Sequence, residues 1–204
     1  MTRPVAVAPG DFNGDGHIDL AVLKDLTGSP RPVEIFLNNG SGIFASTGFQ
    51  YNALQGNVIY DLAAADFNND GKLDLAATGG SQSQTAILLG NNSGGFGAAT
   101  LFATGGNVRA AAVGDFNNDG SIDIALRGDN AATVLPGLGN GSFNAPVIVS
   151  TDGSSLTRSI AARDFNDPAL HRDGNWFLLQ SRQGFASAPF GAAGDRPIPS
   201  AFVP

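Results

Sequence analysis

The sequence predicts an all-β fold built from repeated small sheets, on three observations. The phrase Asp-Phe-Asn recurs at intervals of 55, 49 and 49 residues, starting at Asp11, Asp66, Asp115 and Asp164. Glycine-rich turns recur in step with it, ending at Phe44, Phe96, Phe143 and Phe185. Short apolar segments separated by turn signals lie between them. Eight of the 14 phenylalanines occupy these two repeat positions, which indicates that aromatic side chains pack between units.

The period divides the chain into four units. A period of this size is typical of architectures in which each unit buries its apolar faces against its neighbours. We therefore expect residues 1–204 to form a single domain, or a segment of one. The expected units are approximately residues 1–55, 56–104, 105–153 and 154–190, followed by a tail rich in glycine and proline at 191–204.

Within a unit, the pattern favours strands over helices. In the second unit the apolar segments are residues 62–66, 73–78, 86–89 and 100–103. Segments this short, bounded by glycine and asparagine, are typical of antiparallel strands. The first segment is rich in small residues in every unit, as at Ala63, Ala64 and Ala65, which suits strands that crowd together. The innermost strands of a β-propeller crowd in this way, so we predict about four propeller blades, each a four-stranded antiparallel sheet, with the last degenerate or incomplete.

The first three Asp-Phe-Asn phrases open loops with the pattern Asp-x-Asn-x-Asp-Gly-x-x-Asp. Alternate residues of a curled loop point inward, so oxygen-bearing side chains at positions 1, 3, 5 and 9 can face one point. Glycine at position 6 allows the sharp turn that a Cβ would obstruct. Three carboxylates repel one another until a cation neutralises them. Such oxygen ligands suit calcium better than magnesium or zinc.

The candidate metal ligands are therefore five positions of each loop, of which position 7 contributes its backbone carbonyl oxygen. In the first loop they are Asp11, Asn13, Asp15, His17 and Asp19. In the second loop they are Asp66, Asn68, Asp70, Lys72 and Asp74. In the third loop they are Asp115, Asn117, Asp119, Ser121 and Asp123. We expect about three calcium ions per chain.

Two rival structures compete with a calcium loop between strands. Asp-Gly and Asn-Gly pairs also mark ordinary turns, which account well for a single copy but poorly for three copies in phase. A helix-flanked calcium loop requires glutamate at position 12, where this chain has Val22, Ala77 and Leu126. We therefore retain the calcium loop between strands.

The loop follows a strand of small residues and precedes an apolar strand and a Gly-x-Phe turn. This order resembles the FG-GAP/VCBS repeat of integrin alpha-subunit β-propellers and many bacterial surface proteins. The resemblance covers roughly residues 1–190. It implies that each acidic loop joins the innermost and second strands of a blade, and that the matching residues bind calcium. It also implies a secreted or cell-surface scaffold for adhesion or for recognition of a protein or glycan.

The fourth unit departs from this pattern. Between Asp164 and Phe177, five extra residues interrupt the loop, and Phe177 replaces the closing aspartate, so this loop is a poor calcium site. Relatives usually close with seven blades. Three arrangements remain open: a small closed propeller, an arc completed by another copy as a homo-oligomer, and a segment of a longer protein. We favour the last, since Met1 enters a blade almost at once.

The composition limits the possible partners and locations. The formal charge is −7, and nine of the 17 aspartates lie in the three loops, so the acidity is local to the metal sites. The absence of a basic stripe argues against nucleic acid. The absence of cysteine excludes disulfides and thiolate chemistry. No apolar stretch approaches the ~20 residues of a spanning helix, and an extracellular protein of this sequence needs an export signal that was removed or lies upstream.

A catalytic site would appear as a cluster of polar residues that occurs in one unit only. The sequence contains one cluster of this kind. His171 lies in the interrupted fourth loop, beside Asp167, Arg172 and Asp173. A solvated loop in a decayed site accounts for this cluster more simply, so we expect no enzymatic activity. The alternatives are a propeller-type carbohydrate-active enzyme, such as a polysaccharide lyase, and a non-autonomous fragment of a larger propeller.

Overall fold

The computed structural model describes residues 3–25, 31–54, 58–79, 83–129, 131–150, 159–163, 167–172, 175–179 and 187–190. All regular secondary structure in these segments is β-strand, which confirms the all-β class. Within the same segments, no helix is long and apolar enough to cross a membrane. The fourth Asp-Phe-Asn phrase at 164–166, Asp173, the turn that ends at Phe185 and the tail at 191–204 lie outside the described residues.

Within the described segments, sixteen strands form four antiparallel sheets. The first sheet comprises β1 (Arg3–Gly10), β2 (Asp19–Asp25), β3 (Val33–Asn38) and β4 (Phe44–Tyr51). The second comprises β5 (Ile59–Ala65), β6 (Asp74–Gly79), β7 (Gln84–Leu88) and β8 (Thr100–Ala103). The third comprises β9 (Val108–Gly114), β10 (Asp123–Gly128), β11 (Ala131–Leu135) and β12 (Val147–Ser150). The fourth comprises β13 (Ser159–Arg163), β14 (Asp167–Arg172), β15 (Asn175–Leu179) and β16 (Ser187–Phe190).

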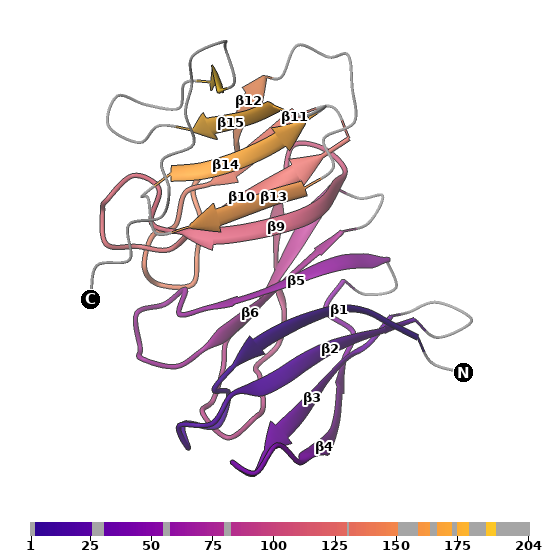
Figure 1. The fold of residues 1–204 in the computed structure, drawn as a ribbon. Helices are drawn as coiled ribbons and strands as arrows, with labels where there is room; N and C mark the ends of the chain where they lie inside the picture. The colour runs from indigo at the N-terminus through magenta and orange to yellow at the C-terminus, as the bar shows by residue number, and fades with distance from the viewer. Residues whose placement is uncertain are drawn as a thin grey trace.

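Each sheet is a simple meander in which the strands pair in the order of the sequence. The first strands of successive sheets contact each other, β1 with β5, β5 with β9 and β9 with β13. The sheets therefore follow one another around their innermost strands, with β1–β4 at one end of the array and β13–β16 at the other (Figure 1). This is the arrangement of propeller blades that the repeat predicted.

Apolar side chains fill the space between neighbouring sheets. Leu23 and Ile35 of the first sheet pack in one buried cluster with Leu75 and Leu88 of the second. A second cluster joins the second and third sheets. All six residues of β6 are buried, because this strand lies between two neighbouring sheets. The small residues of β5 and β9 allow these innermost strands to lie side by side, as their composition indicated.

The fourth sheet differs from the expectation based on the sequence. Strands β13 and β14 pair from Ser159 with His171 to Arg163 with Asp167, so only residues 164–166 lie between them. The expected long loop is absent because the inserted residues supply a strand of their own, whose backbone groups pair in the sheet. His171 therefore belongs to β14, where it also pairs with Trp176 of β15.

One half-buried carboxylate joins two innermost strands. Asp61 of β5 accepts the backbone N–H of Ala111 in β9 at 3.0 Å and that of Leu62 at 3.0 Å. Burial raises the pKa of Asp61, while these two hydrogen bonds and the charge of Arg127 oppose the rise. The folded protein therefore holds the Asp61 proton more tightly than the unfolded chain does.

The substitution Asp61→Asn is expected to reduce the pH dependence of stability. As the pH rises from the ordinary carboxyl pKa through the raised pKa of folded Asp61, the free energy of unfolding falls. In this range the unfolded chain has already released the Asp61 proton, whereas the folded state still has to lose it. Asparagine keeps an oxygen acceptor and carries no charge. Urea denaturation between about pH 4 and pH 7 should show the wild type losing stability relative to the variant as the pH rises. A stability difference that stays constant across this range would contradict the expectation.

Candidate metal centre

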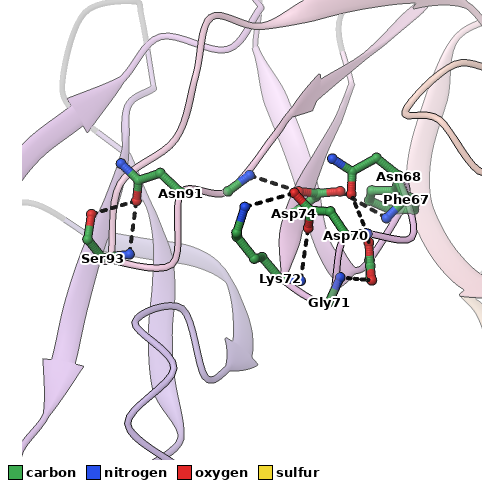
Figure 2. A network of polar contacts seen from close by, with 10 residues as sticks. Phe67, Asn68, Asp70, Gly71, Lys72, Asp74, Asn91 and Ser93 are labelled. Atoms are coloured by element: carbon green, nitrogen blue, oxygen red, sulfur yellow. Dashed lines mark hydrogen bonds and ion pairs between the residues drawn. The ribbon is translucent and has the colours of Figure 1, made fainter.

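The three acidic loops connect the first and second strands of the first three sheets. They span residues 11–18 between β1 and β2, 66–73 between β5 and β6, and 115–122 between β9 and β10. Position 9 of each pattern is the first residue of the second strand. Figure 2 shows the second loop, in which side-chain oxygens accept hydrogen bonds from backbone N–H groups.

The aspartate at position 1 organises the loop backbone. Asp66 Oδ1 accepts the N–H of Asp70 at 3.1 Å, and its Oδ2 accepts that of Gly71 at 2.8 Å. Asp11 and Asp115 accept the same two N–H groups in their own loops. The three loops therefore share a backbone conformation that a position 1 carboxylate holds together.

Positions 3 and 5 add a second set of hydrogen bonds. Asn68 Oδ1 accepts the N–H of Asp70 at 3.1 Å, and Asp70 Oδ1 accepts the N–H of Lys72 at 3.0 Å (Figure 2). The Lys72 ammonium donates to Asp70 at 3.1 Å and lowers the pKa of this carboxyl. In the first and third loops, the amide nitrogen at position 3 donates to the position 5 carboxylate instead. Position 5 is therefore an exposed, ionised carboxylate at neutral pH.

Left-handed backbone at two positions closes each loop. Gly16, Gly71 and Gly120 at position 6 have φ angles of 83°, 79° and 86°. Position 4 is left-handed as well, with φ of 57° at Asn69 and 58° at Asn118. Glycine and asparagine are the residues that adopt this conformation most readily. The glycine that the pattern placed at the sharp turn therefore lies where the turn requires it.

Position 7 contributes its backbone N–H group in all three loops, and in the second loop the Lys72 side chain contacts Asp70 as well. The N–H groups of His17, Lys72 and Ser121 each donate to the position 5 aspartate, at 2.8–3.0 Å. The three side chains share no chemistry. The observed contact uses the N–H group, so the expectation that the position 7 carbonyl oxygen binds a metal stays a prediction.

The aspartate at position 9 is fully buried. Asp19, Asp74 and Asp123 have 0% of their surface exposed. Asp123 Oδ2 accepts the N–H of Phe116 at 3.0 Å, and its Oδ1 accepts that of Gly137 at 2.7 Å. The other two make the equivalent pair of bonds. Position 9 thus ties position 2 of the loop to the end of the third strand in the same sheet.

The sequence did not indicate this structural role of position 9. The available signal was the apolar strand that starts directly after the aspartate, at Leu20, Leu75 and Ile124, because it predicts a buried neighbourhood. A carboxylate offers about four lone-pair positions, so two accepted hydrogen bonds leave further acceptor capacity.

The carboxylates of one loop act on each other electrostatically. Burial raises the pKa of Asp123, and the negative charges of Asp119 and Asp115 raise it further, against the two hydrogen bonds that it accepts. The pKa of Asp74 is raised by the same causes. Positions 1 and 5 therefore lie close enough to position 9 to repel its charge, and a bound cation would relieve this repulsion.

The donor set fits a hard cation. Carboxylates at positions 1 and 5 and an amide at position 3 offer only oxygen as ligand atoms, the preference of calcium. Among the residues that the structure describes, no three His, Cys, Asp or Glu side chains are gathered into a metal cluster. The side chains at positions 3 and 5 instead form hydrogen bonds within the loop, which an entering ion has to displace.

The next sheet along the chain holds the first and the second loop in place. The carbonyl oxygen of Phe67 accepts the N–H of Gly141 at 2.9 Å. The Phe67 ring lies edge-on to Phe143, with centroids 5.8 Å apart, and Phe143 lies edge-on to Phe102 at 5.1 Å. The first loop repeats these contacts with Phe12, Gly94, Phe96 and Tyr51. The expectation that the repeated phenylalanines pack between units is confirmed for Phe12, Phe67, Phe96 and Phe143, whereas Phe44 is exposed.

Comparison with known proteins identifies the repeat. The model of the FG-GAP-like repeat matches three overlapping stretches, residues 11–77, 66–126 and 115–167. Each stretch begins at position 1 of an acidic loop. No curated protein matches the chain.

Solved structures share the fold at low sequence identity. One is the structure of an Agrocybe aegerita lectin that specifically recognises non-reducing terminal N-acetylglucosamine. The match has 18% sequence identity and a TM-score of 0.58, and it covers 89% of this chain and 50% of the lectin chain. Another is BBS1N in complex with ARL6DN, soaked with lead, with 13% identity, a TM-score of 0.52, and coverage of 92% and 70%. This chain therefore spans half the length of the lectin chain that it matches.

Proposed function

Because the chain belongs to the FG-GAP-like repeat family, we propose that it is a calcium-binding β-propeller module that acts outside the cell as a scaffold for recognition or adhesion. The observation that carries the proposal is one acidic loop repeated three times, with the same hydrogen bonds at the same place in three successive sheets. An ordinary hairpin turn needs neither the exposed carboxylate at position 5 nor three such loops in phase.

Calcium would be held by the side-chain oxygens of positions 1, 3, 5 and 9 and the backbone of position 7. Bound calcium supplies positive charge that offsets the repulsion among the loop carboxylates. Since the unfolded chain lacks these sites, binding would stabilise the folded state. Sites of this kind outside the cell typically need calcium at about 10⁻⁴ to 10⁻³ M, which supports an extracellular location.

The two similar structures support recognition as the role of the scaffold. One belongs to a lectin that recognises a terminal sugar, and the other was solved as a complex with a protein. We propose a glycan or a protein as the ligand, and no nucleic acid, because the chain carries a formal charge of −7. A glycan array probed with the full chain in calcium tests the first class of ligand, and incubation of hits with the chain checks that no product forms. Cleavage of a bound glycan would refute a purely recognitional role.

Calcium is expected to raise the melting temperature of the chain by roughly 5–10 °C relative to a chelator. The basis is about 1 kcal/mol per site at millimolar calcium, summed over three sites. Asp70→Asn should remove about a third of this gain, because it deletes a ligand charge while keeping the oxygen that accepts the N–H of Lys72. Calorimetric titration of the wild type should give three ions per chain.

The matched control is Asp129→Asn. The side chains of Asp70 and Asp129 are 32% and 31% exposed, and each pairs with one basic side chain, but Asp129 lies outside the acidic loops. Its substitution should leave the calcium-dependent gain unchanged. Equal losses from Asp70→Asn in calcium and in chelator would refute the ligand role of this loop.

A further inference from the structure

Among the residues that the structure describes, side chains cover only one face of the first sheet. Along β2, Ala21 and Leu23 are fully buried in the cluster shared with the second sheet, whereas the alternating residues Leu20 and Val22 are only half-buried. The open face holds an apolar pocket with a volume of about 300 Å³, lined by Pro4, Leu20, Val22, Lys24, Phe36 and Phe44.

In the second and third sheets, the equivalent face is closed by the preceding sheet. The residue after the position 9 aspartate is Leu20 in the first sheet and Leu75 and Ile124 in the next two. Leu75 and Ile124 are fully buried, in clusters that contain Phe12 and Phe67 from the loop of the preceding sheet. Leu20 has no such phenylalanine in its surroundings among the described residues.

Phe44 shows the same difference. Its counterpart Phe96 lies edge-on to Phe12 and Tyr51 of the preceding sheet, with centroids 5.6 and 5.4 Å apart. Phe143 has the same two kinds of aromatic neighbour. Phe44 is 42% exposed. Phe44 therefore exposes an aromatic surface that Phe96 and Phe143 bury against the preceding sheet.

At position 8 of the acidic loops, the first sheet again exposes a side chain that the next two sheets partly bury. Leu73 and Ile122 pack against the two inter-sheet clusters. Ile18, at the same position of the first loop, is 56% exposed. Strand β2, strand β4 and the first acidic loop therefore expose apolar side chains. The counterparts of these side chains in the second and third sheets pack against the preceding sheet.

One feature of the open face is polar. Lys24 pairs with Glu34, which also accepts a hydrogen bond from the Ser46 hydroxyl. Glu34 is already buried, and its partners satisfy both of its carboxylate oxygens. Covering a pair that is already hydrogen-bonded costs less than covering an isolated charge, so this pair is compatible with a covered face.

We propose that this open face of the first sheet is the docking site for a second copy of the chain. The element that covers this face in the other blades is a preceding blade of the same repeat, so the copy docks with the sheet at the far end of its own array. The first and fourth sheets of one chain lie at opposite ends of the array (Figure 1), so this contact joins two copies head to tail.

The chain length of the similar lectin favours a second copy of this chain as the partner. The chain matches 50% of that structure, so two copies in succession supply about the number of residues of the larger fold. A head-to-tail contact that closes forms a ring, and one that does not close continues into longer assemblies. In both cases, the apolar face of each first sheet is buried.

Light scattering of the full chain tests the proposal. The wild type is expected to show a mass of at least two chains that dissociates on dilution. Ile18→Asp and Phe44→Asp are expected to raise the dissociation constant at least about tenfold, because each places a carboxylate in an apolar contact. Both residues are partly exposed, so both variants should retain the circular dichroism spectrum of the wild type.

Ile148→Asp is the matched control, since Ile148 is 57% exposed but lies on β12 of the third sheet. It should leave the mass unchanged. A monomeric wild type at all concentrations overturns the proposal, and means that another polypeptide segment covers the face or that it stays open. Unchanged assembly in both Ile18→Asp and Phe44→Asp overturns it as well.

The lack of cysteine allows a test of the head-to-tail geometry. Ile18→Cys places a single thiol on the docking face. In a head-to-tail contact, the two thiols lie at different interfaces, so oxidation should give no disulfide-linked dimer. Rapid and complete cross-linking indicates that two first sheets meet face to face and overturns the proposed geometry.

Discussion

Asp123→Ala is expected to lower the free energy of unfolding by about 4 kcal/mol in a chelator, and by about 1 kcal/mol more in calcium because it also removes a proposed ligand. The substitution leaves the N–H groups of Phe116 and Gly137 buried without an acceptor, at about 1–3 kcal/mol each. It also removes the connection between the third acidic loop and the end of β11. Urea denaturation followed by circular dichroism measures the loss.

Two variants separate this structural role from metal binding. Asp119→Asn removes an exposed position 5 carboxylate of the same loop, so its loss should depend on calcium. Asp123→Asn keeps one oxygen acceptor and should fall between the wild type and Asp123→Ala. If the loss caused by Asp123→Ala disappears in the chelator, position 9 acts mainly as a metal ligand and the structural account is wrong.

The sequence predicted the conformation of the acidic loops because local residues determine it. Asp66 accepts N–H groups that lie only four and five residues further along the chain. Gly71 takes a φ of 79°, which few other residues adopt readily. Such contacts need no knowledge of the tertiary structure, and a pattern that repeats in phase marks them clearly.

The partners of position 9 could not be predicted in the same way. Asp19 accepts the N–H of Asn38, which lies 19 residues away, and this contact exists only because β2 pairs with β3 in a particular register. An acidic residue at the start of an apolar strand is consistent with a metal ligand and with a buried hydrogen-bond acceptor. The strand pairing makes it an acceptor of two backbone N–H groups.

The fourth sheet shows a different limit. The sequence indicated correctly that the acidic pattern breaks down after Asp164, and that the last unit differs from the others. It did not indicate that the insertion forms β14, since a segment such as Asp167–Arg172 has no strong strand pattern of its own. Pairing with β13 and β15 on both sides makes it a strand.

The contact between neighbouring blades leads to the second large effect. Phe67 is 1% exposed, lies edge-on to Phe143 of the next sheet, and belongs to the cluster that joins the second and third sheets. Phe67→Ala is expected to lower the free energy of unfolding by about 3–5 kcal/mol, since it leaves a cavity between two sheets that cannot close without moving them. Phe44→Ala, at an exposed aromatic position of the first sheet, should cost less than about 1 kcal/mol at concentrations where the chain is monomeric.

A double-mutant cycle with Phe143→Ala tests whether the two rings act together. If the edge-on contact stabilises the stacking of blades, the double variant should be more stable than the sum of the single losses implies, with a coupling of about 0.5–1.5 kcal/mol. Urea denaturation of the wild type, both single variants and the double variant gives this coupling. Additive losses would mean that each ring fills space independently of the other. The coupling between neighbouring sheets would then depend on the hydrogen bond from the Gly141 N–H to the Phe67 carbonyl and on the aliphatic side chains of the shared cluster.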